Sequence, residues 1–546
     1  MTSRSRSRTR RGVALAVSFM FIAAACGSDD EEGGSTTAGG AASTAAPATA
    51  APADTEAPAD TEAPADTEAP ADTEAPADTE APADTEAPAD TGGETGTAGC
   101  SEIDSSIDAD YGENTGRFLS DLACANDAPL AAEGEPIVVG FQNLEGDPNG
   151  SFPEFSLAAQ AAADYINAEL GGLGADLQNG VPGRPIELVV CKSVVSPDDS
   201  QRCANELLTE EPMLVFSSIN FFGNQLGIYS AGGVPAIVIT PITVGDFTTE
   251  GVYSIGGGGG CLGVHTGMVE FATNDLGGRH ISVPWADTPP GVVCYYDLEA
   301  KPLDVLNGTV EGSSEKAGTI PELEHIGVPI KPATPDVTPQ VAEVLDFDPD
   351  VIMFSAQGAD CWNLVGGLGR AGWTPQDIPL VLSGACIDFE AMEEAGPLAE
   401  GVYFIGSSGA LLNPIDTIED ARDAAEAETY QTKAAEYGLA EDQLNKGFAT
   451  QGFIALLSLW EQTSRIVVDG GEVTSDSIAE SYADTDGDHM FGSTPLSCST
   501  APEPYIAVCN GEVSANQWDG EKLVPVRERF SGVDLVAGTE LKPGPG

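Results

Sequence analysis

The chain has 546 residues, of which 22 are basic and 87 acidic, so its formal net charge at pH 7 is −65. Removing the five arginines of residues 1–26 and the 18 acidic residues of 27–99 leaves 17 basic and 69 acidic side chains, so residues 100–546 alone carry −52. This excess of negative charge repels nucleic acid and anionic lipid head groups, and it argues against both as partners.

Residues 1–26 are predicted to be a targeting segment. Five arginines precede an apolar run at 13–25, which is too short to span a bilayer comfortably. Small residues lead up to Cys26, and the pattern resembles a bacterial lipoprotein signal peptide in which Cys26 receives the lipid. We therefore expect an extracytoplasmic protein that is lipid-anchored to the bacterial cell membrane.

Residues 27–99 are predicted to be a disordered, acidic, proline-rich linker. The hexamer Ala-Pro-Ala-Asp-Thr-Glu repeats six times from Ala51 to Glu86. Without large apolar side chains this segment cannot offset chain entropy by burial. Its carboxylates repel one another and its prolines stiffen it, so we expect a spacer between the lipid and the folded part.

Ten cysteines remain after Cys26, and an even number in an exported chain favours disulfides. The sequence leaves the connectivity open. We expect cysteines that are neighbours along the chain to pair, because each pair would join adjacent strand-end loops. The expected pairs are Cys100–Cys124, Cys191–Cys203, Cys261–Cys294, Cys361–Cys386 and Cys498–Cys509. Zinc is the alternative, but there is no Cys-x-x-Cys and the four histidines are scattered, so we expect no metal site and no cofactor.

Residues 100–135 are predicted to form a cysteine-containing N-terminal extension, polar and without strong periodicity. From Pro136 onward, short apolar strands alternate with helices. Strands are expected at 137–141, 186–190, 213–217, 236–240, 280–285, 323–328, 350–355, 379–382 and 401–405. Helices are expected at 155–170, 200–208, 223–231, 265–274, 294–307, 335–347, 361–371, 416–437 and 447–466. The tail is expected to be hairpin-like, with strands at 505–509 and 522–526. Two successive β-α-β series predict an α/β fold of two doubly wound parallel-sheet lobes.

Particular segments carry a family resemblance. They are EPIVVGF at 135–141, GRPIELVV at 183–190, AGGVPAIVITP at 231–241 and PIKPATPDVT at 329–338. In this order they resemble type I periplasmic binding proteins, in particular the branched-chain amino acid (leucine/isoleucine/valine) substrate-binding proteins of ABC transporters. The resemblance implies two lobes joined by a multi-strand hinge. Lobe 1 would comprise 136–254 and 407–495, lobe 2 would comprise 255–406, and 496–546 would form a C-terminal hinge or tail segment.

The resemblance also implies a small ligand held between the lobes by loops at strand ends. Each polar residue there could instead cap a helix or satisfy a turn. The expected ligand-binding residues are Phe152, Ser217, Ser218, Asn220, Phe221, Thr240, Thr243, Asp287, Gln357 and Ser383.

Several positions depart from the amino-acid-binding pattern. Phe221 stands where the family commonly has serine, and Pro290 where an aromatic side chain usually faces the ligand. Ser383 to Cys386 occupy the turn in which a carboxylate would hold an ammonium group. The ligand therefore stays open among branched-chain amino acid-like solutes, amides and carboxylates.

We expect a solute-binding lipoprotein of an ABC importer that closes its hinge on a small solute. Its partners would be that solute, the ABC permease subunits and the membrane through Cys26, with no nucleic acid, and it would act as a monomer. A ligand-sensing receptor component is the alternative. An envelope enzyme is disfavoured, because there is no Gly-x-Ser-x-Gly motif and no serine or cysteine matched with a histidine and an acid.

Overall fold

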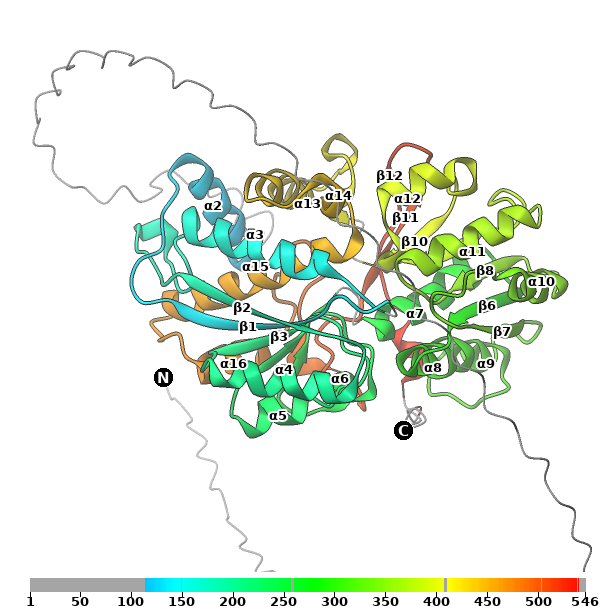
Figure 1. Cartoon of the computed structure of the whole chain (residues 1–546), viewed down its shortest axis with the longest axis horizontal. Helices are drawn as coiled ribbons and strands as arrows, with labels where there is room; N and C mark the ends of the chain where they lie inside the picture. Colours follow the sequence, from blue (N-terminus) through cyan, green and yellow to red (C-terminus); the bar gives the residue numbers. More distant parts are fainter. Residues whose placement is uncertain are drawn as a thin grey trace, which may run out of the picture. The chain divides into compact units, whose positions relative to one another are not determined.

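The computed structural model describes residues 113–148, 150–256, 260–406, 410–501, 503–537 and 539. The predicted signal peptide, its Cys26 and the repeat linker lie outside the described residues. The described part is an α/β protein with two mainly parallel sheets flanked by helices (Figure 1), which confirms the predicted fold class. None of its helices is both long enough and apolar enough to cross a membrane.

The first sheet has five parallel strands in the order β2-β1-β3-β4-β5. The strands are β1 (Ile137–Leu144), β2 (Ile186–Ser193), β3 (Leu214–Ser217), β4 (Ala236–Val238) and β5 (Val252–Ser254). The chain moves outward from β1 to β2 and then returns past β1 to β3. In open α/β sheets such a reversal leaves a crevice at the carboxyl ends of the strands, where ligands bind.

Helices cover both faces of the first sheet because alternate strand residues are apolar on each side. Ile137, Val139 and Phe141 of β1 share a core with α3 (Pro153–Ala168) and α15 (Gly447–Val468). Val215 and Val238 pack on the opposite side. The helices on that side are α4 (Pro197–Thr209) and α5 (Leu226–Ala231), and the short α6 (Val244–Thr248) and α16 (Ser475–Ala483) complete this half.

The backbones of α3 and α15 approach closely at Gly452, where an added Cβ would lie 2.2 Å from the carbonyl oxygen of Phe155. Gly452→Ala is therefore expected to lower the free energy of unfolding by about 1–3 kcal/mol through overpacking. Denaturant unfolding measures the loss. Gly227→Ala in α5 is the control, since a Cβ there meets nothing within 4 Å. Equal effects of the two substitutions would contradict the tight packing of α3 on α15.

The second sheet has seven strands in the order β12-β11-β10-β9-β8-β6-β7. Five are parallel: β6 (His280–Ala286), β7 (Glu324–Ile330), β8 (Val351–Phe354), β9 (Leu380–Ser383) and β10 (Tyr403–Gly406). Strands β11 (Val513–Trp518) and β12 (Leu523–Phe530) add an antiparallel hairpin to β10.

One face of the second sheet packs on α7 (Cys261–Glu270) and α9 (Lys301–Asn307), and α8 (Pro289–Tyr295) lies beside them. The other face packs on α10 (Thr338–Asp346), α11 (Ala359–Arg370) and α12 (Phe389–Ala395). The chain passes between the sheets three times: after β5, after β10 and before β11.

The tail differs from its prediction at residues 505–509, which do not form a strand. Instead, Val508 makes a single parallel bridge to Ser254 at the edge of the first sheet, and Cys509 is disulfide-bonded to Cys498. One disulfide and one bridge therefore hold this stretch in place of the repeated hydrogen bonds of a paired strand. The predicted strand at 522–526 corresponds to β12, and its partner is β11 rather than 505–509.

The N-terminal extension also differs, because it contains helix α2 (Glu113–Asp127). Phe118, Leu122 and Ala125 are buried along one side of it, at helical spacing. The Phe118 ring lies 5.7 Å from that of Trp460 in α15. The prediction of a polar extension without periodicity was therefore wrong for this stretch.

Four of the expected cysteine pairs form disulfides in the structure: Cys191–Cys203, Cys261–Cys294, Cys361–Cys386 and Cys498–Cys509. Cys124 is also disulfide-bonded. Its expected partner, Cys100, lies outside the described residues.

Candidate functional site

A cavity of about 1000 Å³ lies between the strand ends of the two sheets. Its walls are the loops that follow β1, β6, β8 and β9, together with the first turns of α7 and α15. The volume is at the upper end of the roughly 300–1,000 Å³ typical of small-molecule pockets. Because loops at the carboxyl ends of strands line it, the cavity lies where open parallel sheets bind ligands.

Aromatic side chains form much of the apolar wall. Phe152 and Phe448 meet edge to face, with ring centroids 5.2 Å apart, and Phe448 also stacks on Phe155. Trp362 of α11 lines the opposite wall and is half-buried. Its indole Nε1 donates a hydrogen bond to the carbonyl oxygen of Cys386 at 3.0 Å, which fixes the ring orientation. These rings provide large, rigid contact surfaces for the apolar part of a solute.

Glu154 is a buried carboxylate in the cavity wall, in the first turn of α3. Burial raises the pKa of Glu154, and the nearby positive charge of Lys446 acts in the opposite direction. The Glu154 carboxylate accepts a hydrogen bond from its own backbone N–H. Because burial penalises its charged form, this group is suited to receive a further hydrogen-bond donor from a solute.

The two halves touch at one edge of the cavity. The backbone N–H of Gly447, at the start of α15, donates to the carbonyl oxygen of Ile387 at 3.1 Å. Beside it, Asp388 and Lys446 form an isolated antiparallel bridge, and their side-chain charges lie 3.6 Å apart. The loop after β9 and the N-terminus of α15 thus meet through backbone as well as side chains.

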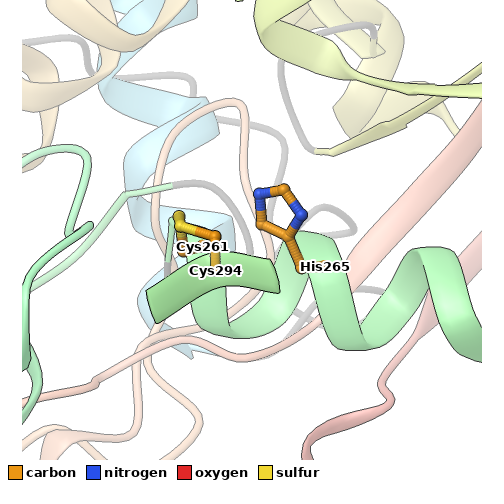
Figure 2. Close-up of side chains that lie close together, drawn as sticks. All are labelled: Cys261, His265 and Cys294. Carbon is orange, nitrogen blue, oxygen red and sulfur yellow. A yellow bond between two sulfur atoms is a disulfide. The ribbon is translucent and has the colours of Figure 1, made fainter. Parts of the chain in front are cut away.

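His265 and a disulfide form the floor of the cavity on the α7 side. Cys261 and His265 lie one turn apart on α7, and Cys261 is bonded to Cys294 of α8 (Figure 2). The His265 Nδ1 atom lies 2.8 Å from Oε1 of Glu299, which is fully buried. Burial raises the pKa of Glu299, while His265 acts to lower it.

Four of the sequence-predicted ligand residues lie at this site. Phe152 and Gln357 line the main cavity. Thr240 and Ser383 line a smaller pocket of about 70 Å³ that shares Gln357 and His265 with it. Thr240 Oγ1 donates to Gln451 Oε1 at 2.5 Å, and Ser383 Oγ donates to the Ala356 carbonyl oxygen at 3.1 Å.

The six other predicted residues line neither of these two pockets. Ser217 accepts a hydrogen bond from Gln225, Ser218 donates to the carbonyl oxygen of Gln142, and Asn220 donates to Ser200, so the loop after β3 is held against β1 and α4. Phe221 is buried in the core, Thr243 caps α6 and Asp287 is exposed.

Sequence reasoning missed Glu154, His265, Trp362 and Lys446. Glu154 had a detectable signal, because an acid directly after Pro153 marks the first turn of a helix that follows a strand. His265 also had a signal, because its spacing of four residues from Cys261 places both on one face of a helix. Trp362 and Lys446 come from distant parts of the chain, and only the tertiary fold brings them to the cavity.

Residues 137–498 match the sequence profile of the periplasmic binding protein family. The chain belongs to that family. It is a family of non-enzymatic ligand-binding proteins, in agreement with the expectation that this protein is not an enzyme. Among curated proteins, none matches the sequence.

Solved structures of this fold resemble the chain over most of its length. A branched-chain amino acid ABC transporter protein from Thermus thermophilus with bound valine has a TM-score of 0.56 at 13% identity, covering 74% of this chain and 98% of that one. A fatty acid ABC transporter substrate-binding protein from Thermomonospora curvata has a TM-score of 0.55 at 15% identity, covering 76% and 97%. An R. palustris solute-binding protein in complex with 4-hydroxybenzoate has a TM-score of 0.54 at 15% identity, covering 73% and 97%. At these identities the likeness establishes the fold.

Proposed function

We propose that this periplasmic binding protein captures a small solute in the cavity between its two sheets and delivers it to an ABC-type permease. The observation that carries the proposal is the cavity of about 1000 Å³ at the carboxyl ends of both sheets. The solved structures of the same fold include ABC transporter solute-binding proteins. Disulfide bonds are typical of exported proteins and fit this role. The lipid on Cys26 would hold the chain at the membrane.

The lining of the cavity favours an amphipathic solute. Phe152, Phe448 and Trp362 would contact an apolar body, while Glu154 and Gln357 would bind polar groups. Thr240 and Ser383 would border the narrow end. The structures of similar fold hold ligands as different as valine and 4-hydroxybenzoate, so the fold itself does not select an amino acid.

Two lobes would close on the solute by rotating about the three connections between the sheets. Lobe 1 would comprise 136–254 and 407–495, and lobe 2 would comprise 255–406. Thermal shift of the exported protein against a library of amino acids, amides, carboxylates and aromatic acids tests the proposal. A melting temperature that rises for one solute class, together with contraction in small-angle scattering, is the expected result. A chain that responds to none of them argues against the proposal.

Trp362→Ala is expected to weaken binding of the solute found in this way by about 10-fold or more, because buried aromatic contacts dominate binding energy. Isothermal titration calorimetry measures the change. Tyr296→Ala is the control, since Tyr296 is 53% exposed and lies outside the cavity lining. Unchanged affinity in Trp362→Ala would remove α11 from the proposed binding surface.

A further inference from the structure

The cavity floor combines three side chains that together can ligate a metal ion. The sulfur atoms of Cys261 and Cys294 and a ring nitrogen of His265 all lie within 4.8 Å of one another. All three residues line the cavity. Figure 2 shows that their side chains lie close together, Cys261 and His265 on α7 and Cys294 on α8. The sulfurs are joined as a disulfide, so only the dithiol form could bind metal.

Glu299 is the second observation that points to a metal. Its Oε1 atom is hydrogen-bonded to Nδ1 of His265, with 2.8 Å between the two atoms. Its buried Oε2 atom has no hydrogen-bond partner among the described residues. With Nδ1 held by a carboxylate, the Nε2 lone pair of His265 is available to a cation. Histidine ligands of zinc are oriented by buried carboxylates in this manner.

We propose that, once the Cys261–Cys294 disulfide is reduced, Cys261, Cys294 and His265 bind a zinc ion whose fourth coordination position opens into the cavity. Two thiolates and an imidazole suit zinc, and they do not suit calcium or magnesium, which require oxygen ligands. Three protein ligands with one open position would let water or an oxygen atom of the solute complete the coordination.

Side-chain rotation is sufficient to form this site. The Cα atoms of Cys261 and Cys294 lie 5.6 Å apart. Rotation about the two Cα–Cβ bonds can separate the sulfurs to roughly the 3.8 Å that two ligands at about 2.3 Å from a tetrahedral zinc require. Cys261 is the first residue of α7, where the helix dipole favours a thiolate.

The chemistry needs a thiol reductant. Both cysteines line the cavity, so a small-molecule thiol would reach the disulfide through it. Two equivalents of a small-molecule thiol (R–SH) convert the disulfide into two cysteine thiols and leave as R–S–S–R. Zinc then replaces the two thiol protons, forms two Zn–S bonds and stays Zn²⁺ throughout. The oxidised chain would lack the site, so zinc affinity would report the redox state of the cavity floor.

Cobalt(II), a spectroscopic substitute for zinc, provides the test. The exported full chain is reduced anaerobically with dithiothreitol and desalted, and alkylation with mass spectrometry verifies free thiols at Cys261 and Cys294. The expected result is one Co²⁺ per reduced chain with thiolate-to-cobalt charge-transfer absorption, displaced by Zn²⁺ and absent from the oxidised chain. Circular dichroism establishes that the chain stays folded.

Variants separate this site from the other cysteines. The double variant Cys261→Ser/Cys294→Ser should lose the cobalt signal, whereas Cys191→Ser/Cys203→Ser should keep it. Glu299→Gln should weaken zinc affinity about 10- to 100-fold while keeping a thiolate spectrum, and His265→Ala should weaken it further.

Cobalt spectra that survive Cys261→Ser/Cys294→Ser would overturn the proposal. So would free thiols at both positions without cobalt binding, or a disulfide that is reduced only on unfolding. Solute binding by the oxidised chain is measured separately, so either proposal can fail alone.

Discussion

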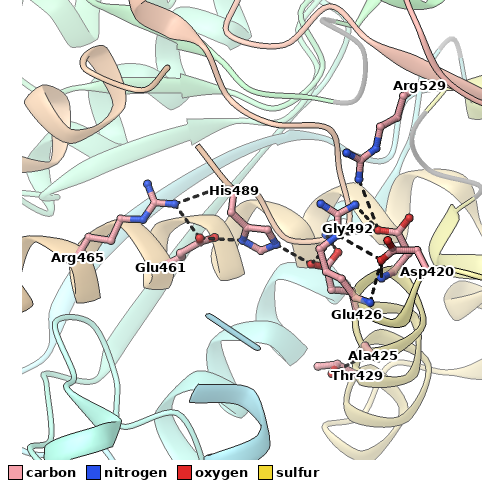
Figure 3. Close-up of polar contacts among 11 residues, drawn as sticks. Asp420, Ala425, Glu426, Thr429, Glu461, Arg465, His489, Gly492 and Arg529 are labelled. Atoms are coloured by element: carbon pink, nitrogen blue, oxygen red, sulfur yellow. Dashed lines mark hydrogen bonds and ion pairs between the residues drawn. The ribbon is translucent and has the colours of Figure 1, made fainter. Parts of the chain in front are cut away.

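Replacing His489 by alanine is expected to lower the free energy of unfolding by about 3–5 kcal/mol, because it removes the buried positive charge that lies between two buried carboxylates. His489 has a side chain that is 0% exposed, and it lies between two acids (Figure 3). Its Nδ1 atom is 2.8 Å from Glu461 Oε1, and its Nε2 atom is 2.7 Å from Glu426 Oε1.

The same network joins three segments of the chain. Glu461 belongs to α15 and Glu426 to α13 (Ala421–Thr429), and the second oxygen of Glu426 accepts the backbone N–H of Gly492 at 2.8 Å. Arg465 adds a contact of 2.8 Å to Glu461. Removing the imidazole would therefore loosen α13 and the segment at 489–492, and it would remove the positive charge that lies between Glu461 and Glu426.

Chemical denaturation of the folded chain measures this effect. His280→Ala is the matched control, because His280 has a side chain 48% exposed whose ion pair, to Glu324, spans 4.0 Å. The control is expected to change stability by no more than about 0.5 kcal/mol. A loss below about 1 kcal/mol in His489→Ala would show that the network contributes little to folding.

The network also predicts a pH dependence. Burial alone would lower the pKa of His489, but the charges of Glu461 and Glu426 outweigh it and raise the pKa to about 9. A raised pKa in the folded state means that the imidazolium contributes its full stability below about pH 6.5, the ordinary value for histidine, and loses it as the pH rises through 9. The stability difference between wild type and His489→Ala should therefore shrink from pH 6.5 to 9.5 in parallel denaturation curves. A difference that stays constant would contradict a charged His489.

Replacing Gly447 by alanine is expected to weaken solute binding by about 10-fold or more, because it pushes apart the two halves where they meet. A Cβ at Gly447 would lie 2.2 Å from the carbonyl oxygen of Gly384 in the loop after β9. The hydrogen bond from Gly447 N–H to the Ile387 carbonyl and the Asp388–Lys446 pairing lie in the same contact. Under the proposed closure, the variant would favour open states and so reduce affinity.

Stability separates this outcome from simple misfolding. Gly447 lies where the two halves meet, so their separation would relieve the clash of the added Cβ without unfolding either half, and the unfolding midpoint should change little. Gly366→Ala in α11 is the control, because a Cβ there meets only the end of the Arg370 side chain, at 3.4 Å. Equal affinity in Gly447→Ala and wild type would show that this contact plays no part in holding the solute.

The α/β class and most elements of the two sheets could be predicted from apolar runs and turn signals. Helix α15 was expected at 447–466 and is found at Gly447–Val468. The predictions failed where tertiary contacts decide. Helix α2 is stabilised by the burial of Phe118 and Leu122, with the Phe118 ring against Trp460 of α15. The tail hairpin pairs with β10, which is far away in sequence.

The candidate site could be predicted less well. The family resemblance and the position at strand ends suggested Ser217, Ser218 and Asn220. These side chains are occupied by hydrogen bonds to β1, to α4 and to the residue that precedes α5. Phe152 and Gln357 lie in the loops after β1 and β8 and line the cavity. Lys446 and Trp362 contact it from segments whose placement depends on the packing of both sheets, which no local pattern encodes.

Native mass spectrometry of the folded chain, purified without added ligand and again after incubation with the solute library, shows whether the cavity holds a solute. We expect one small molecule bound per chain, released on denaturation and bound more weakly by Trp362→Ala. A bare protein mass in every preparation, with no solute retained by the wild type, would contradict the assignment of the cavity as a solute-binding site.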